Sequence, residues 1–127
     1  DRELGHSHVT ELAVGANMHE RKTKMSELSD AFIALPGGAG TLEEIFEQWT
    51  WAQLGIHLKP CAFLNVTGFY DDLLKFIQLT TVKGFTHARF TDSIIASDSI
   101  EEILQQFDSF QGPKPKWGMV DQQALVK

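Results

Sequence analysis

Residues 31–44 read AFIALPGGAGTLEE, and this stretch decides the fold class. It begins with a short apolar run, residues 31–35, which is typical of a central parallel strand that is buried on both faces. Three glycines follow within four positions, and an amphipathic stretch typical of a helix comes directly after them. The sequence therefore predicts a strand that passes through a glycine-rich turn straight into a helix.

Strand-like and helix-like segments alternate along the rest of the chain. We expect further strands over residues 9–14, 61–66 and 93–96, and helices over residues 18–28, 41–54, 70–82 and 100–107. Asn17 is expected to cap the first of these helices, Gly55 to end the second, and residues 97–99 to cap the last. This alternation predicts a parallel α/β sheet with right-handed crossovers, on which ligands bind beyond the carboxyl ends of the strands.

Composition narrows the classes of protein and partner. The 127 residues are 43% hydrophobic and 22% charged, which fits one soluble domain. The net charge of −6, without a basic stripe, argues against a nucleic acid polymer as partner. No apolar run approaches the roughly 20 residues of a membrane helix. Cys61 is the only cysteine, so we expect a buried thiol in a cytoplasmic protein.

The glycine turn has the chemistry of a phosphate site. Gly37, Gly38 and Gly40 let a ligand approach the backbone closely, and the positive end of the following helix attracts an anion. The Thr41 hydroxyl either caps that helix or bonds a phosphate oxygen. No lysine follows as in Walker A, and Glu43 stands where a dinucleotide fingerprint needs its third glycine. A plain tight turn is the alternative reading, and the flanking strand and helix favour phosphate.

The helix after the turn carries two apolar faces and three acids. One face is expected to pack on the sheet, and its members are Leu42, Ile45, Phe46 and Trp49. Trp51 and Leu54 fall on the opposite side, where either a second copy of the chain or another helix of the same chain would cover them. Glu43, Glu44 and Glu47 complement the helix dipole near its start, and periodicity does not choose among them.

The segment NMHERKTKMSEL, residues 17–28, places an arginine among methionines. Met18, Arg21 and Met25 share one helix face, a setting in which methionine is normally buried. Arg21 therefore either snorkels to water or grips a phosphate or carboxylate at the edge of a pocket. The histidines lack zinc-type spacing, and neither a serine-hydrolase motif nor a histidine-supported cysteine is visible.

MHERK at residues 18–22 and PGGAGTLEE at residues 36–44 together resemble the paired motifs of the Lonely Guy (LOG) family. These proteins are cytokinin-activating phosphoribohydrolases that have also been described as lysine decarboxylases. The resemblance runs from about residue 12 to residue 107, and it implies a Rossmann-like parallel sheet flanked by helices, a homodimer, no metal and no cofactor. The family's N-terminal β-α units are missing here, so we expect residues 1–111 to be the C-terminal part of a single domain and residues 112–127 to be an irregular tail.

The resemblance also implies an activity and a site. The expected reaction hydrolyses the N-glycosidic bond of a cytokinin riboside 5′-monophosphate, a small nucleoside monophosphate, to free base and ribose 5-phosphate. By match to the motifs, Arg21 and Glu44 are the catalytic residues. The residues expected to bind the phosphate and the rest of the substrate are Gly37, Gly38, Gly40, Thr41, Lys22 and Met18.

The chemistry of the two catalytic side chains agrees with that reaction. Glu44 could stabilise the positive charge that develops on the ribose or orient the attacking water. Arg21 keeps its proton, so we expect it to position the substrate and stabilise charge.

Four alternative functions remain open at this point. A non-catalytic carrier of a nucleotide or a phosphorylated cofactor would use the same turn, but it needs no carboxylate beside the sugar. The protein could also be an AMP nucleosidase or a purely structural dimer module. Lysine decarboxylation would need pyridoxal phosphate on a lysine such as Lys22 or Lys24, which nothing in the sequence marks as desolvated.

Overall fold

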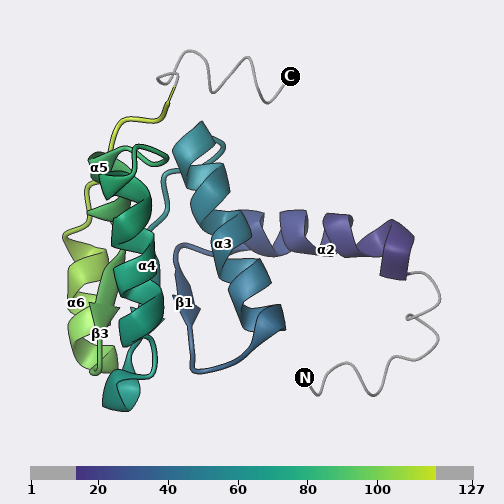
Figure 1. Ribbon diagram of the computed structural model, residues 1–127. Helices are drawn as coiled ribbons and strands as arrows, with labels where there is room; N and C mark the ends of the chain where they lie inside the picture. Colours follow the sequence, from purple (N-terminus) through teal and green to yellow (C-terminus); the bar gives the residue numbers. More distant parts are fainter. Residues whose placement is uncertain (1–13, 117–127) are drawn as a thin grey trace. The chain divides into compact units, whose positions relative to one another are not determined.

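The computed structural model describes residues 14–116, with side chains from residue 20 onward. The chain divides into two compact units, residues 1–30 and residues 31–127. The first unit contributes helix α2 (Val14–Leu28), and the second holds the sheet and the other helices (Figure 1). Within residues 14–116, no helix combines the length and the apolar character needed to cross a membrane.

The second unit is built on a sheet of three parallel strands in the order β1-β2-β3. These are β1 (Phe32–Ala34), β2 (Cys61–Leu64) and β3 (Ile95–Ser97). The register sets Ala34 beside Phe63 and Phe63 beside Ala96, so the carboxyl ends of the three strands lie at one edge. The predicted parallel α/β class is confirmed.

Helices connect and follow the strands along the chain (Figure 1). They are α3 (Ala39–Leu54) between β1 and β2, α4 (Asp71–Val82) and α5 (Ala88–Thr91) between β2 and β3, and α6 (Ile100–Asp108) after β3. A 3-10 turn, Val66–Gly68, precedes α4.

Both faces of the sheet are covered, because alternate residues of each strand point to opposite sides. On one face α3 and α4 contribute to a buried cluster made of Ala34, Ile45, Cys61, Phe63, Tyr70 and Ile77. On the other face α6 contributes Ile103, which packs with Ala62 and Ile95. The predicted stripe of α3 packs against the first cluster, as expected, whereas Trp51 and Leu54 are half-buried.

The structure contradicts three expectations for the N-terminal segment. Helix α2 begins at Val14, so Asn17 lies inside the helix and the prediction that it caps the helix is wrong. Asparagine favours caps but costs less than about 1 kcal/mol relative to alanine in a helix interior, so the helix can continue through it. Val14 is helical rather than extended, and residues 9–13 of the predicted strand lie outside the described part. Met25 is 44% exposed, so the expectation of a buried methionine there is also wrong.

Helix α3 begins at Ala39, two residues before its predicted start. Gly38 is the N-cap and its carbonyl accepts from the Leu42 N–H at 3.0 Å, which closes the first turn. Thr41 is therefore inside the helix and is not its cap. Glu43 and Glu44 lie beyond the first turn, where the helix dipole acts on them more weakly than predicted.

Other helix ends agree with the sequence, with one omission. Gly55 ends α3 in the left-handed conformation, with φ 83°, and the Ser99 side chain caps α6 by accepting from the Glu102 N–H. The short helix α5 was not predicted. Its N-cap is His87, whose Nδ1 accepts from the Arg89 N–H at 3.1 Å, and histidine is not among the residues that signal a helix start.

Candidate functional site

The glycine turn lies between the carboxyl end of β1 and the N-terminus of α3. At the start of an α-helix the first N–H groups have no acceptor within the helix. In α3 these N–H groups belong to Ala39, Gly40 and Thr41. The N-cap residue, Gly38, has no side chain that could accept a hydrogen bond from them. Their positive ends point into one region, and this is the arrangement that binds phosphate in many α/β proteins.

The glycines of the turn serve two different purposes, and none of the three has a positive φ. A Cβ atom at Gly37 would overlap Thr41 Oγ1, so glycine is required there by the packing of the Thr41 side chain. A Cβ atom at Gly38 or Gly40 would meet nothing within 4 Å. These two residues therefore leave their backbone uncovered toward open space, where a ligand can approach closely.

The structure distinguishes Glu43, Glu44 and Glu47, among which the sequence periodicity could not choose. All three lie on the side of α3 away from its core stripe, and Glu44 is one helical turn beyond Gly40 on the same face. Glu43 and Glu44 are exposed, whereas Glu47 is half-buried and its Oε1 atom is shielded from solvent. Glu44 is therefore the exposed carboxylate that shares a helix face with the uncovered backbone of Gly40.

Tyr70 and Asn65, which the sequence did not mark as site residues, hold the glycine turn through hydrogen bonds. The Tyr70 hydroxyl donates to the carbonyl of Leu35 at 2.6 Å, and Asn65 Oδ1 accepts from the Tyr70 N–H at 2.6 Å. Burial raises the pKa of Tyr70, and a hydrogen bond with the backbone of Gly37 opposes that shift. Asn65 could have been noticed, because it is a polar residue directly after a buried strand, where ligands of parallel sheets bind.

The remaining predicted site residues lie in the first unit, on α2. Arg21 is exposed and Lys22 is half-buried, while the side chain of Met18 lies outside the described part. The structure thus brings Gly37, Gly38, Gly40, Thr41 and Glu44 together in the second unit. Arg21, Lys22 and Met18 belong to the first unit, so their roles at this site are taken up as proposals below.

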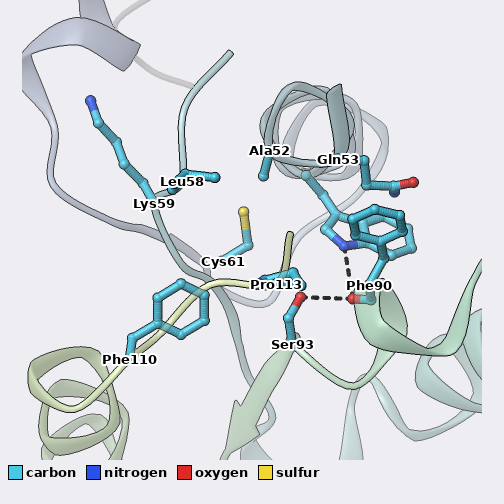
Figure 2. A pocket seen from close by; sticks show the side chains of 10 residues that line it. Ala52, Gln53, Leu58, Lys59, Cys61, Phe90, Ser93, Phe110 and Pro113 are labelled. Carbon is cyan, nitrogen blue, oxygen red and sulfur yellow. Dashed lines mark hydrogen bonds between the residues drawn. The ribbon is translucent and has the colours of Figure 1, made fainter. Parts of the chain in front are cut away.

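A small cavity lies near the amino ends of the strands (Figure 2). Its lining includes Trp49, Leu58, Cys61, Phe90, Phe110 and Pro113. Trp49 Nε1 and Ser93 Oγ both donate to the Phe90 carbonyl, at 3.2 and 2.7 Å. The cavity volume is about 10 Å³, room for at most one water, so a nucleotide does not fit there.

Cys61 borders this cavity and is 4% exposed. Burial raises the pKa of its thiol to about 12, which keeps the thiolate from forming near neutral pH. The predicted packing role of Cys61 is confirmed.

His57 is buried and held in one tautomer. Its Nδ1 accepts from the Lys59 N–H at 3.1 Å, so Nε2 carries the proton that faces Gln48 Oε1 at 3.2 Å. Burial, and then the positive charge of Lys59, lowers the pKa of His57 to about 4. Among the described residues, no group of three or more His, Cys, Asp and Glu side chains is placed to hold a metal ion.

An uncovered glycine turn at the carboxyl end of a parallel strand, followed by a helix N-terminus, is typical of α/β proteins that bind phosphorylated ligands. Residues 1–107 match the family model whose description is "Possible lysine decarboxylase". The chain belongs to this family.

Curated relatives give a finer comparison. The chain is 46% identical over 109 residues to cytokinin riboside 5′-monophosphate phosphoribohydrolase LOG3 of Arabidopsis thaliana, covering 86% of this chain and 51% of the relative. For LOG4 of the same plant the identity is 47% with the same coverage. For LOG of Oryza sativa subsp. japonica it is 44% over 119 residues, covering 94% and 49%. The chain spans about half the length of these relatives, and the resemblance to the LOG family is confirmed.

Proposed function

We propose that this protein hydrolyses the N-glycosidic bond of a cytokinin riboside 5′-monophosphate, an N6-substituted adenine nucleotide, to free base and ribose 5-phosphate. The observation that carries the proposal is the uncovered backbone of Gly38 and Gly40 at the N-terminus of α3, with Glu44 one turn further on the same face. The names of the relatives, which are phosphoribohydrolases of this substrate, support the same choice.

The 5′-phosphate would sit against the free N–H groups at the start of α3, with the Thr41 hydroxyl nearby. This placement leaves the ribose within reach of the next turn of the helix, where Glu44 is exposed. As the bond between the base and C1′ breaks, positive charge develops on the sugar, and a carboxylate stabilises it or orients the water that attacks C1′. The hydroxyl of that water stays on C1′, and its proton leaves with the base.

Arg21 is proposed as the second catalytic residue, with Lys22 and Met18 beside the substrate. An arginine remains protonated throughout, so its contribution is to bind and orient an anionic or polar group of the substrate. Its exposed position on α2 leaves the guanidinium available for such a contact.

The proposal includes a homodimer in the cytoplasm. Helix α3 carries Trp51 and Leu54 away from its core stripe, and soluble oligomers are most often symmetric copies of one chain. A free, buried Cys61 is consistent with a reducing compartment. Light scattering coupled to size exclusion measures the mass directly, and a monomeric mass at micromolar concentration would contradict the dimer.

Lysine decarboxylation, which the family description names, is not the reaction that we propose. Pyridoxal chemistry needs a lysine whose amine forms a Schiff base, and burial favours such a group. Five of the described lysines are exposed, namely Lys24, Lys75, Lys83, Lys114 and Lys116. Lys22 and Lys59 are half-buried, so neither has the full burial that would favour a Schiff-base lysine.

The reaction is tested by incubating the full-length protein with isopentenyladenosine monophosphate, and separately with AMP, and separating the products by chromatography. We expect equal amounts of free base and ribose 5-phosphate from the N6-substituted nucleotide. Cleavage of AMP alone would identify an AMP nucleosidase, and binding without cleavage would identify a carrier. Release of carbon dioxide from lysine in the presence of pyridoxal phosphate would identify a decarboxylase.

The site assignment is tested with matched variants. Glu44→Gln keeps the size of the side chain and removes its charge, and we expect turnover to fall about 100-fold or more. Glu43→Gln changes the neighbouring exposed acid and should leave turnover nearly unchanged.

Arg21→Ala should lower turnover to a similar degree, whereas Lys24→Ala removes an exposed charge from the same helix with little effect. Wild-type activity in Glu44→Gln or Arg21→Ala contradicts the corresponding role.

A further inference from the structure

We propose that Tyr70 is a positioning residue, which holds the glycine turn in the shape that accepts phosphate through the hydrogen bond from its hydroxyl to the carbonyl of Leu35. The identity of the ligand rests on the proposed function. The role of Tyr70 itself rests on contacts within the second unit.

The hydroxyl of Tyr70 has a fixed position. The residue is 2% exposed, and its ring makes edge contacts with Phe63 and Phe69, with centroid distances of 4.9 and 4.8 Å. Two such contacts restrict rotation of the ring, so the oxygen remains 2.6 Å from the Leu35 carbonyl. Leu35 lies two residues before Gly37, at the point where β1 has ended and the turn begins.

The backbone of Tyr70 is also anchored across the sheet. Its N–H donates to Asn65 Oδ1 at 2.6 Å, and the N–H of Asn65 donates to the carbonyl of Ser97 at 2.8 Å. Asn65 follows β2 and Ser97 ends β3, so one chain of hydrogen bonds links the carboxyl ends of all three strands. Tyr70 transmits the rigidity of the sheet to the glycine turn.

Few side chains hold the turn besides those of Tyr70 and Thr41. Leu35 is 55% exposed, Pro36 is exposed, and Gly38 and Gly40 have no side chains. A glycine loses more backbone freedom on ordering than any other residue, and a ligand that must order a loop binds more weakly. The main effect of losing the Tyr70 hydroxyl should therefore appear in phosphate affinity, because the buried ring keeps its packing.

The test compares Tyr70→Phe with Thr80→Val in the full-length protein. The Thr80 hydroxyl also belongs to α4 and also donates to a backbone carbonyl, that of Ile77 at 2.6 Å, but it is ten residues further along the chain. Both variants lose one hydroxyl and its hydrogen bond to a backbone carbonyl, and the melting temperatures show how much a general loss of stability contributes to each. The measurements are the melting temperature, the Kd for ribose 5-phosphate by calorimetry, and KM and kcat for the nucleotide.

We expect Tyr70→Phe to weaken ribose 5-phosphate binding and to raise KM by about fivefold to tenfold, with kcat nearly unchanged. Thr80→Val should change both by less than twofold. Asn65→Ala, which removes the acceptor for the Tyr70 N–H, should shift affinity in the same direction as Tyr70→Phe.

Two results overturn the inference, and they are distinguishable. If the wild-type protein binds ribose 5-phosphate and Tyr70→Phe binds it equally well, Tyr70 has only a structural role and the proposed function stands. If the wild-type protein binds neither ribose 5-phosphate nor the nucleotide, the proposed function fails together with the inference.

Discussion

The side chain of Thr41 lies over Gly37, so that a Cβ atom at residue 37 would stand 3.0 Å from the Thr41 Cβ and overlap its hydroxyl oxygen. Gly37→Ala should therefore lower the free energy of unfolding by about 1–3 kcal/mol, because Thr41 is held within the first turn of α3. Urea denaturation measures the change. The double variant Gly37→Ala/Thr41→Ala removes the overlapping hydroxyl and should recover part of the loss, and an unchanged midpoint in Gly37→Ala would refute this packing.

Replacing Gly40 by alanine should stabilise the protein, in contrast to the same change at Gly37. A Cβ atom there meets nothing within 4 Å, and the residue lies inside a helix. Gly40→Ala should raise the free energy of unfolding by about 0.5–1 kcal/mol, because alanine loses less backbone freedom than glycine. The same methyl group would enter the space proposed for the phosphate and should weaken ribose 5-phosphate binding. Higher stability with unchanged affinity for ribose 5-phosphate would show that the phosphate does not bind at the N-terminus of α3.

His57 should make stability depend on pH. Its pKa is lowered from 6.5 to about 4 in the folded protein, so between these values the unfolded state binds more protons. The contribution of His57 is complete above about pH 6.5 and is lost as the pH falls toward 4.

Between pH 7.5 and 5.5 the loss should be about 1 kcal/mol, measured as the shift in unfolding free energy. His57→Gln lowers stability at both pH values, but it should remove this part of the pH dependence. The same decline in the variant and in the wild type would assign the dependence to other groups.

Cys61 should be inert until the protein unfolds. Burial raises the pKa of its thiol to about 12 and leaves the residue 4% exposed. Thiol reagents at pH 8 should leave the peptide that contains Cys61 unmodified in the native protein, and should modify it fully in denaturant, as measured by mass spectrometry. Rapid native labelling would show that the cavity beside Cys61 opens.

The sequence predicted the local features of the second unit well, because each depends on a few neighbouring residues. The apolar run before the glycines, the stripe along α3, the left-handed Gly55 and the Ser99 cap are all short-range signals. Helix starts were less accurate, since Gly38 caps α3 without a side chain and Asn17 lies inside α2. Backbone hydrogen bonds set these boundaries, and side-chain preference only biases them.

By itself, the sequence determined the alternation of strands and helices, the place of the glycine turn at the end of a buried strand, and the family motifs that contain Arg21 and Glu44. Only the tertiary structure decided that Thr41 covers Gly37, that Gly38 and Gly40 face open space, and that Tyr70 reaches Leu35, 35 residues away. The reason is that strand order and register bring distant residues together. Periodicity along one segment reports which face of that segment is apolar, but carries no information about which residue of another segment will meet it.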